Sequence, residues 1–204
     1  MKIGLFFGTF NPIHIGHLII ANHMVNHTDL EQVWMVVTPQ NPFKQNKNLL
    51  ADFHRLALVN IAVEDHPKLV AKDIEFKLPK PNYTIDTLVY LKEKHPNHTF
   101  SLIMGEDNLL TLDKWKNYEQ IVANYSLYIY PRAMTHSEQL ASIDASFSID
   151  DLLSRYPNAT YCSDLPLLKL SSTYIRKVIK EQKDVRYLLT PEVLKYIDEM
   201  NFYK

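Results

Sequence analysis

Glycine is scarce in this sequence, since only four occur among 204 residues. An average composition of about 7% would give roughly fourteen. Because a chain that avoids glycine keeps it where a side chain cannot fit, the four positions indicate places of close approach. Gly4, Gly8 and Gly16 fall within the first sixteen residues, and Gly105 is the fourth. The early part of the chain is therefore the first place to look for a ligand site.

Cysteine and long apolar runs are also lacking. Cys162 is the single cysteine, which excludes an intrachain disulfide and a cysteine-rich zinc site. The apolar run at the start is broken by Gly8 and Pro12, too early for a signal peptide, and no later run approaches the roughly 20 residues of a membrane span. We expect a cytoplasmic protein without a membrane partner.

Neither sign of charge dominates, because 22 Lys and Arg balance 23 Asp and Glu. Without a basic block, a long nucleic-acid footprint is not expected, and any anion must be bound locally. The length and the 46% hydrophobic content suit one domain over residues 1–204 with a real core. The sequence leaves homo-oligomer formation open.

Predicted strands and helices alternate along the chain. Short apolar runs predict strands at 2–7, 32–39, 68–76, 98–105, 126–131 and 159–166, and helices are expected at 16–27, 52–65, 84–95, 114–125, 135–157, 171–182 and 190–200. Asp52 is the expected N-cap of the second helix, and Arg55 is as compatible with helix surface as with a site. Solid apolar strands predict a Rossmann-like, doubly wound parallel sheet with helices on both faces and a short C-terminal helical segment. Ligands bind such sheets at the carboxyl ends of the strands, which Gly8 and Gly105 follow.

The stretch "GTFNPIHIGHL" places His14 and His17 about one helical turn apart at the start of a predicted helix. Backbone amides and the helix dipole favour an anion there, imidazole N–H groups add donors, and Gly16 lets a ligand approach. A polyphosphate fits better than a metal, which needs about three protein ligands. His23 and His27 repeat the spacing without a glycine turn and are expected on a solvated helix face.

A second stretch, "LKLSSTYIRK", offers hydroxyls at a helix start with a guanidinium one turn later. Ser171, Ser172, Thr173 and Arg176 could cradle a second part of a phosphate chain. Taken alone, this stretch is better explained by ordinary helix capping; together with the first motif it indicates a second phosphate cradle.

Together the two stretches resemble the nucleotidyltransferase superfamily, which carries GTFxPxHxGH early and ISSTxIR late. The resemblance is closest to the bacterial nicotinate-nucleotide adenylyltransferases. It extends to "PNYTIDTL" at 81–88, "GEDNLLTLDKWKNYEQI" at 105–121, "PFK" at 42–44 and the segment 185–203.

The resemblance implies a reaction between ATP and nicotinate mononucleotide with Mg²⁺, giving nicotinate adenine dinucleotide and pyrophosphate. The mononucleotide phosphate would attack the α-phosphate of ATP directly, so catalysis would rest on positioning and charge stabilisation. By the family pattern the catalytic set is His14, His17 and Arg176; the ATP-binding set is Gly8, Thr9, Phe10, Lys44, Gly105, Asp107, Ser172 and Thr173; and the mononucleotide set is Thr84, Trp115, Lys116 and Arg132. No protein metal ligand is implied.

Four positions depart from the family pattern. Phe7 replaces a glycine, Asn11 the usual aspartate, Phe43 a histidine, and Lys116 a frequent tyrosine. Asn11 removes a negative charge near the phosphates, which puts a metal-linked role there in doubt. Lys116 would attract the carboxylate of the acid substrate and so favour it over the amide.

Three alternatives stay open. "HIGH" is also a signature of one class of aminoacyl-tRNA synthetases, although the chain is short and nearly neutral. A sister transferase would use phosphopantetheine, nicotinamide mononucleotide or CTP. A nucleotide-binding module without turnover is kept open by Asn11 and Phe43.

Overall fold

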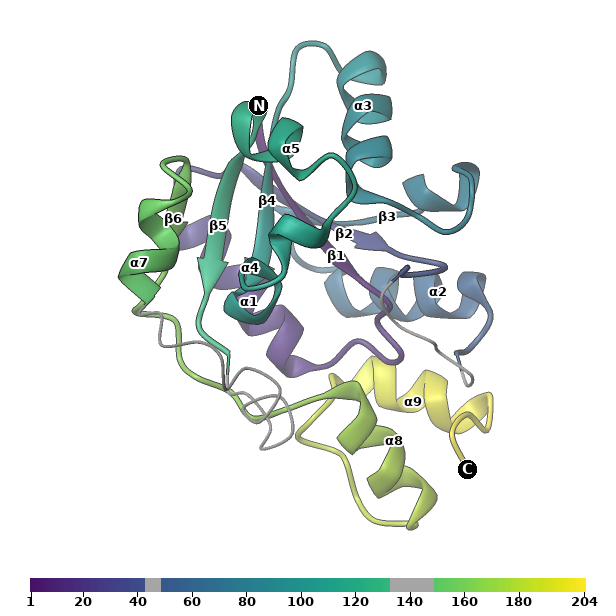
Figure 1. The fold of residues 1–204 in the computed structure, drawn as a ribbon. Coiled ribbons are helices and arrows are strands. Elements are labelled where there is room, and N and C mark those ends of the chain that lie inside the picture. The colour runs from purple at the N-terminus through teal and green to yellow at the C-terminus, as the bar shows by residue number, and fades with distance from the viewer. Residues whose placement is uncertain (43–48, 133–148) are drawn as a thin grey trace.

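The computed structural model describes residues 1–42, 49–132 and 149–204 (Figure 1). Phe43, Lys44 and most of the helix expected at 135–157 lie outside these ranges.

Six strands form one parallel sheet, which confirms the predicted fold class. They are β1 (Lys2–Gly8), β2 (Gln32–Val37), β3 (Leu69–Lys72), β4 (Thr99–Gly105), β5 (Ser126–Tyr130) and β6 (Ala159–Tyr161). Their spatial order is β3-β2-β1-β4-β5-β6, and every neighbouring pair is parallel. This is the doubly wound Rossmann order, whose switch point between β1 and β4 is where ligands bind, at the carboxyl ends.

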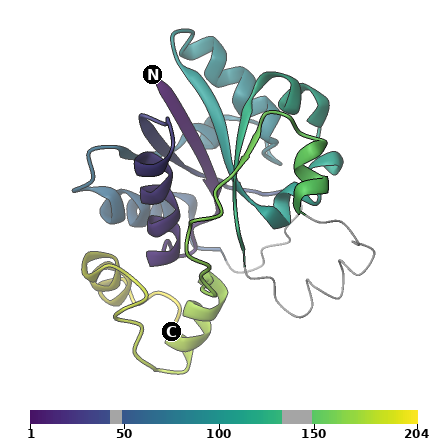
Figure 2. The same cartoon turned by 90° about the vertical axis from the view of Figure 1, so that its left-hand side faces the viewer.

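Helices cover both faces because each central strand is apolar on both sides. Alternate residues of a strand pack into two different hydrophobic cores, one on each face of the sheet: Phe6 of β1 lies in the first core and Leu5 in the second. The first core is closed by α1 (Ile15–His27), α2 (Asp52–Val63), α8 (Ser172–Lys180) and α9 (Pro191–Glu199). The second is closed by α3 (Thr84–Lys94), α5 (Tyr118–Asn124) and α7 (Ile149–Ser154). Figure 2 shows the sheet between these layers.

The C-terminal helices lie at the carboxyl edge of the sheet. Figures 1 and 2 show α8 and α9 at the lower end of the molecule, toward which β5 points. Ile175 of α8 and Val193 of α9 are buried in the first core, which anchors both helices to the sheet domain. Within the described residues, no helix has the length and apolarity to cross a membrane.

Several local predictions are wrong. Asp52 is the first residue of α2 and not its N-cap, which is Ala51. The expected strand at 68–76 ends at Lys72, and 74–77 forms a 3₁₀ helix, η1 (Ile74–Lys77). The expected helix at 114–125 begins only at Tyr118, because Asn117 adopts a left-handed conformation with φ of 52°. His23 is not on a solvated face, since only 8% of it is exposed.

Candidate active site

The turn between β1 and α1 is shaped by a buried aromatic ring. Phe10 has φ of 43° and is 1% exposed. Such a backbone costs on the order of 1–3 kcal/mol, which the burial of the ring can offset. A Cβ at Gly8 would lie 2.7 Å from the Phe10 ring. Gly8 is therefore needed for Phe10 to fold under the strand, rather than only for a ligand to approach.

His14 and His17 form a stacked pair at the start of α1, with ring centroids 3.7 Å apart. His14 is the N-cap residue, and its backbone N–H donates to Nδ1 of His17 over 3.3 Å. Because Nδ1 of His17 accepts this bond, the proton of the neutral ring is on Nε2. His17 is thus held in the tautomer that donates through Nε2, as a phosphate ligand requires.

His14 is buried, and this burial lowers its pKa to about 4. Its Nδ1 is buried and has no hydrogen-bond partner among the described residues. A Cβ at Gly16 would lie 3.0 Å from this nitrogen, so Gly16 makes room for the His14 ring. His14 is therefore a neutral imidazole near pH 7, able to donate one hydrogen bond but carrying no charge.

Burial of His14 makes stability depend on pH. The unfolded chain takes up a proton near pH 6.5 and the folded one only near pH 4. Stability is therefore expected to fall as pH drops through this window, by about 3 kcal/mol from His14. His14→Gln should flatten the dependence, measured by urea denaturation at several pH values. An unchanged slope in the variant would contradict this assignment.

The late motif is attached to the early one by direct hydrogen bonds. Ser171 caps α8 by accepting from the backbone of Tyr174 over 3.2 Å, as predicted. Ser172 donates from Oγ to the Pro12 carbonyl over 2.8 Å, and Arg176 donates to the Asn11 carbonyl over 2.7 Å. The guanidinium of Arg176 is therefore fixed beside the turn that precedes the two histidines.

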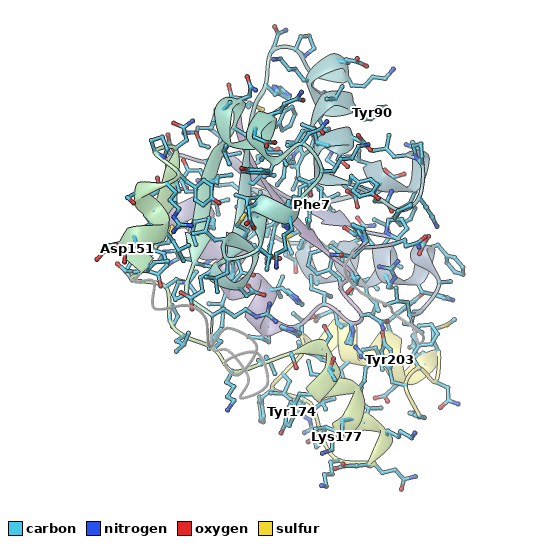
Figure 3. All side chains as sticks on the ribbon, in the orientation of Figure 1. Phe7, Tyr90, Asp151, Tyr174, Lys177 and Tyr203 are labelled. Carbon is cyan, nitrogen blue, oxygen red and sulfur yellow. The ribbon has the colours of Figure 1, made fainter. Side chains whose placement is uncertain are left out.

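Asn11 is the buried centre of this junction, only 1% exposed. Its Oδ1 accepts from the Tyr203 hydroxyl over 2.8 Å and from the Leu50 backbone over 3.2 Å (Tyr203 is labelled in Figure 3). Burial raises the pKa of Tyr203 well above its usual range, so the hydroxyl stays a neutral donor. An amide oxygen suits two neutral donors, whereas an aspartate would place a negative charge in a desolvated position. The observed role of Asn11 is to connect three segments.

Two adjacent cavities open at the carboxyl edge of the sheet, of about 410 and about 180 Å³. Both cavities are lined by Phe7, Gly8, Thr9 and Asn108, so a ligand in one cavity would lie beside a ligand in the other. The larger brings together the residues predicted for phosphate and ATP, namely Gly8, Thr9, Phe10, His14, His17, Ser172, Thr173 and Arg176. The smaller brings together Thr84, Trp115 and Lys116, three of the four predicted for the mononucleotide.

Arg132 lies with the predicted ATP residues in the larger cavity and not with the mononucleotide set. Its backbone N–H donates to Oε1 of Glu106 over 3.1 Å, and its guanidinium pairs with Asp107. Gly105 and Asp107 are not in the lining of either cavity. Asp107 therefore stands behind Arg132, and Oδ1 of Asp107 is buried without a hydrogen-bond partner in the described part of the chain.

Lys116 is at the smaller cavity but its charge is already engaged. The ammonium lies 2.9 Å from both carboxylate oxygens of Asp86 and 4.9 Å from the centroid of the Tyr83 ring. Its attraction for a substrate carboxylate is therefore reduced by the neighbouring negative charge.

Glu75 also lines the smaller cavity. It is buried, and this burial raises the pKa of its carboxyl group.

Arg55 is a site-shaping residue that the sequence did not identify. Of the two positions that the sequence left open for Arg55, helix surface is excluded, because Arg55 is 0% exposed. Its guanidinium donates to the carbonyls of Thr9 over 2.6 Å and Thr38 over 2.9 Å, and pairs with Asp52. It thereby joins the segments that follow β1 and β2. The only sequence signal was its i,i+3 spacing from Asp52, which many surface helices share.

Comparison with known proteins agrees with this geometry. A model of the cytidylyltransferase-like family matches residues 5–178. A probable nicotinate-nucleotide adenylyltransferase of Flavobacterium psychrophilum is 56% identical over 204 residues, covering 100% of both chains. The corresponding protein of Flavobacterium johnsoniae is 54% identical with the same coverage. The chain belongs to the nicotinate-nucleotide adenylyltransferase family.

A solved structure extends the likeness in fold. Nicotinic acid mononucleotide adenylyltransferase of Plasmodium falciparum, complexed with NaAD, superposes with a TM-score of 0.77 at 22% identity. The match covers 99% of this chain and 97% of that chain. At this identity the comparison supports the fold, and the chemistry must be argued from the residues of this chain.

Proposed function

We propose that this protein transfers the adenylyl group of ATP to nicotinate mononucleotide. The observation that carries the proposal is the pair of adjoining cavities, one with phosphate donors and one with Trp115 and Thr84, which share Gly8 and Thr9. A triphosphate in the larger cavity and a pyridine nucleotide in the smaller would meet at these shared residues. The relatives named for this activity support the same substrates.

The proposed step is an in-line displacement at phosphorus. A phosphate oxygen of the mononucleotide forms a bond to the α-phosphorus of ATP while the bond to the β-phosphate bridging oxygen breaks, and pyrophosphate leaves. His17 and Arg176 donate hydrogen bonds to the charge that develops on the phosphate oxygens. His14 adds a neutral donor. No protein nucleophile is required, so positioning and charge stabilisation supply the rate enhancement.

ATP enters this scheme as its Mg²⁺ complex. Among the described residues that line the larger cavity none is a carboxylate, whereas Arg132, Arg176, His14 and His17 are donors. This set suits phosphate oxygens, and Mg²⁺ prefers oxygen ligands, so the phosphates themselves would hold the ion. Mg²⁺ is accordingly proposed as part of the substrate.

The deciding experiment is a pyrophosphate-release assay with the purified protein. ATP is combined with nicotinate mononucleotide, nicotinamide mononucleotide or phosphopantetheine, with CTP replacing ATP in parallel, and the products are identified by chromatography. We expect fastest release with ATP and nicotinate mononucleotide. Faster turnover of another pair would assign the chain to a sister reaction, and ATP binding without any release would favour a non-catalytic module.

His17→Ala is expected to lower kcat by at least about tenfold, because a directed donor to the developing charge is lost. Steady-state kinetics with both substrates saturating measure the effect, and circular dichroism checks the fold. His66→Ala is the matched control, since His66 lines neither cavity. A kcat near that of the wild type would show that His17 does not contact the reacting phosphates.

Lys116→Met should lower the preference for the acid over the amide mononucleotide by about two- to fivefold, the effect of one solvent-screened charge. The effect is small because Asp86 already pairs with the ammonium. The ratio of kcat/KM for the two mononucleotides measures it. Lys114→Met, at an exposed position outside both cavities, is the control. An unchanged ratio in K116M would remove Lys116 from substrate selection.

A further inference from the structure

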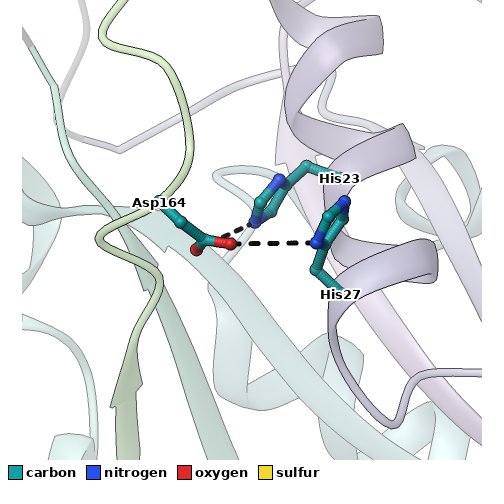
Figure 4. A group of neighbouring side chains, drawn as sticks. All are labelled: His23, His27 and Asp164. Carbon is teal, nitrogen blue, oxygen red and sulfur yellow. Dashed lines mark ion pairs between the residues drawn. The ribbon is translucent and has the colours of Figure 1, made fainter.

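A second histidine pair on α1 faces a carboxylate at the other end of the helix. His23 and His27 are one turn apart, and the carboxylate of Asp164, which follows β6, faces both rings from one side (Figure 4). Nε2 of His23 lies 3.3 Å from Oδ1 of Asp164, and Nδ1 of His27 lies 3.7 Å from Oδ2. The two rings are stacked with centroids 4.2 Å apart and an interplanar angle of 3°.

The cluster holds a buried nitrogen whose hydrogen bonding is incomplete. His23 is 8% exposed, and within the described residues its Nε2 has no hydrogen-bond partner although it points at Asp164. A buried polar atom left in this state costs on the order of 1–3 kcal/mol. A cation placed among the three side chains would give this nitrogen a partner.

The ligand atoms lie near enough to one another for side-chain rotation to bring all three onto one transition-metal ion. One atom from each side chain lies within 4.8 Å of the others. Zn–N and Zn–O bonds of about 2.0–2.2 Å at tetrahedral angles separate ligand atoms by about 3.4 Å. The 3.3 Å between His23 and Asp164 is close to that value. Asp164 and His27 are 65% and 58% exposed, so both side chains are free to rotate, and the His27 ring would turn out of its stacked position to direct its nitrogen at the ion.

We propose that His23, His27 and Asp164 bind one divalent d-block cation, Zn²⁺ by preference, with water as the fourth ligand. Two imidazoles at i and i+4 on a helix plus a carboxylate form a donor set that suits Zn²⁺ and its neighbours better than Mg²⁺. This ion is distinct from the Mg²⁺ that accompanies ATP. The inference does not depend on the proposed function.

The role of the ion is structural. His23 and His27 follow His17 by six and ten residues, so they lie about 9 and 15 Å along the helix axis from it. Asp164 directly precedes Leu165 and Pro166, which line the larger cavity. A bound metal therefore fastens the segment after β6 to α1, and with it one wall of that cavity. Because the ion would bind only the folded state, it stabilises that state by RT ln(1 + c/Kd), where c is the free Zn²⁺ concentration, and the melting temperature rises with Zn²⁺ concentration.

The test is metal titration of protein freed of metal by a chelator and gel filtration. Zn²⁺ is followed by isothermal titration calorimetry, and Co²⁺ by the visible absorption of a tetrahedral N,O site. We expect one ion per chain in this site, a rise in melting temperature with Zn²⁺, and neither effect with Mg²⁺. His27→Gln, at an exposed position, should weaken Zn²⁺ binding at least about tenfold and abolish the rise. Asp164→Asn should weaken binding as well.

His66→Gln keeps the number of histidines equal to that of H27Q and should bind as the wild type does. Equal Zn²⁺ affinity in H27Q and the wild type would place the metal elsewhere, for instance at His14 and His17, and overturn the proposal. Heat and absorption changes no larger than those of buffer would also overturn it, and would leave the cluster as an ion pair only.

Discussion

Arg176→Ala is expected to lower kcat by about 10²–10³-fold, the effect of removing one preorganised donor from a developing oxyanion. The expectation rests on the way the guanidinium is held. One nitrogen donates to the Asn11 carbonyl over 2.7 Å and another to Thr173 over 3.2 Å, so the side chain is fixed in the larger cavity before substrate arrives. Single-turnover rates with ATP and nicotinate mononucleotide measure the chemical step.

Two further measurements separate catalysis from folding in this variant. Arg176→Lys keeps the charge but loses the planar fork, so it should recover only part of the rate. The melting temperature reports the lost hydrogen bond to Asn11, a net effect of about 1 kcal/mol. If R176A loses rate only in proportion to lost folded protein, the guanidinium serves the junction and not the reaction.

Arg55→Ala is expected to destabilise the fold by about 3–5 kcal/mol, because it leaves buried backbone carbonyls unpaired and creates a cavity. The side chain is 0% exposed, and its removal leaves the carbonyls of Thr9 and Thr38 without their donor. For a chain of this length the melting temperature should drop by about 10 °C or more. Urea unfolding followed by fluorescence gives the free energy of unfolding directly.

The matched control is Arg186→Ala, an arginine whose side chain is 68% exposed, which should change stability by less than about 0.5 kcal/mol. Arg55→Lys should recover little of the lost stability. A compact ammonium cannot replace the planar guanidinium, which donates to the carbonyls of Leu50, Thr9 and Thr38 at once. A loss in R55A no greater than in R186A would show that the buried guanidinium is not needed to hold the strand ends.

The sequence predicted the sheet because its strands are apolar on both sides and alternate with helical segments, a pattern that parallel sheets require. It also predicted which loops carry the site, since the histidine motif and Ser172, Thr173 and Arg176 fall where helices begin. Local chemistry sufficed for these. Scarce glycine indicated crowded positions correctly, but side chains of the protein itself cause part of the crowding, because Phe10 and His14 occupy the space at Gly8 and Gly16.

Features that depend on contacts distant in the sequence were not predictable. Arg55 shows no pattern that separates a buried bridge from a surface cation, because its partners are backbone carbonyls, which every residue has. The contact of His23 with Asp164 joins positions that are 141 residues apart in the sequence. The helix start at Tyr118 depends on one left-handed residue, Asn117, which propensity alone does not reveal.

The junction at Asn11 has a consequence for the order of events in folding. Its partners Arg176 and Tyr203 are 165 and 192 residues away along the chain. Contacts of such separation carry a large loop-closure entropy and form late. During synthesis the sheet strands emerge first, so an early nascent chain holds the histidine pair without its guanidinium. The larger cavity therefore gains its Arg176 guanidinium only when α8 and α9 dock on the sheet.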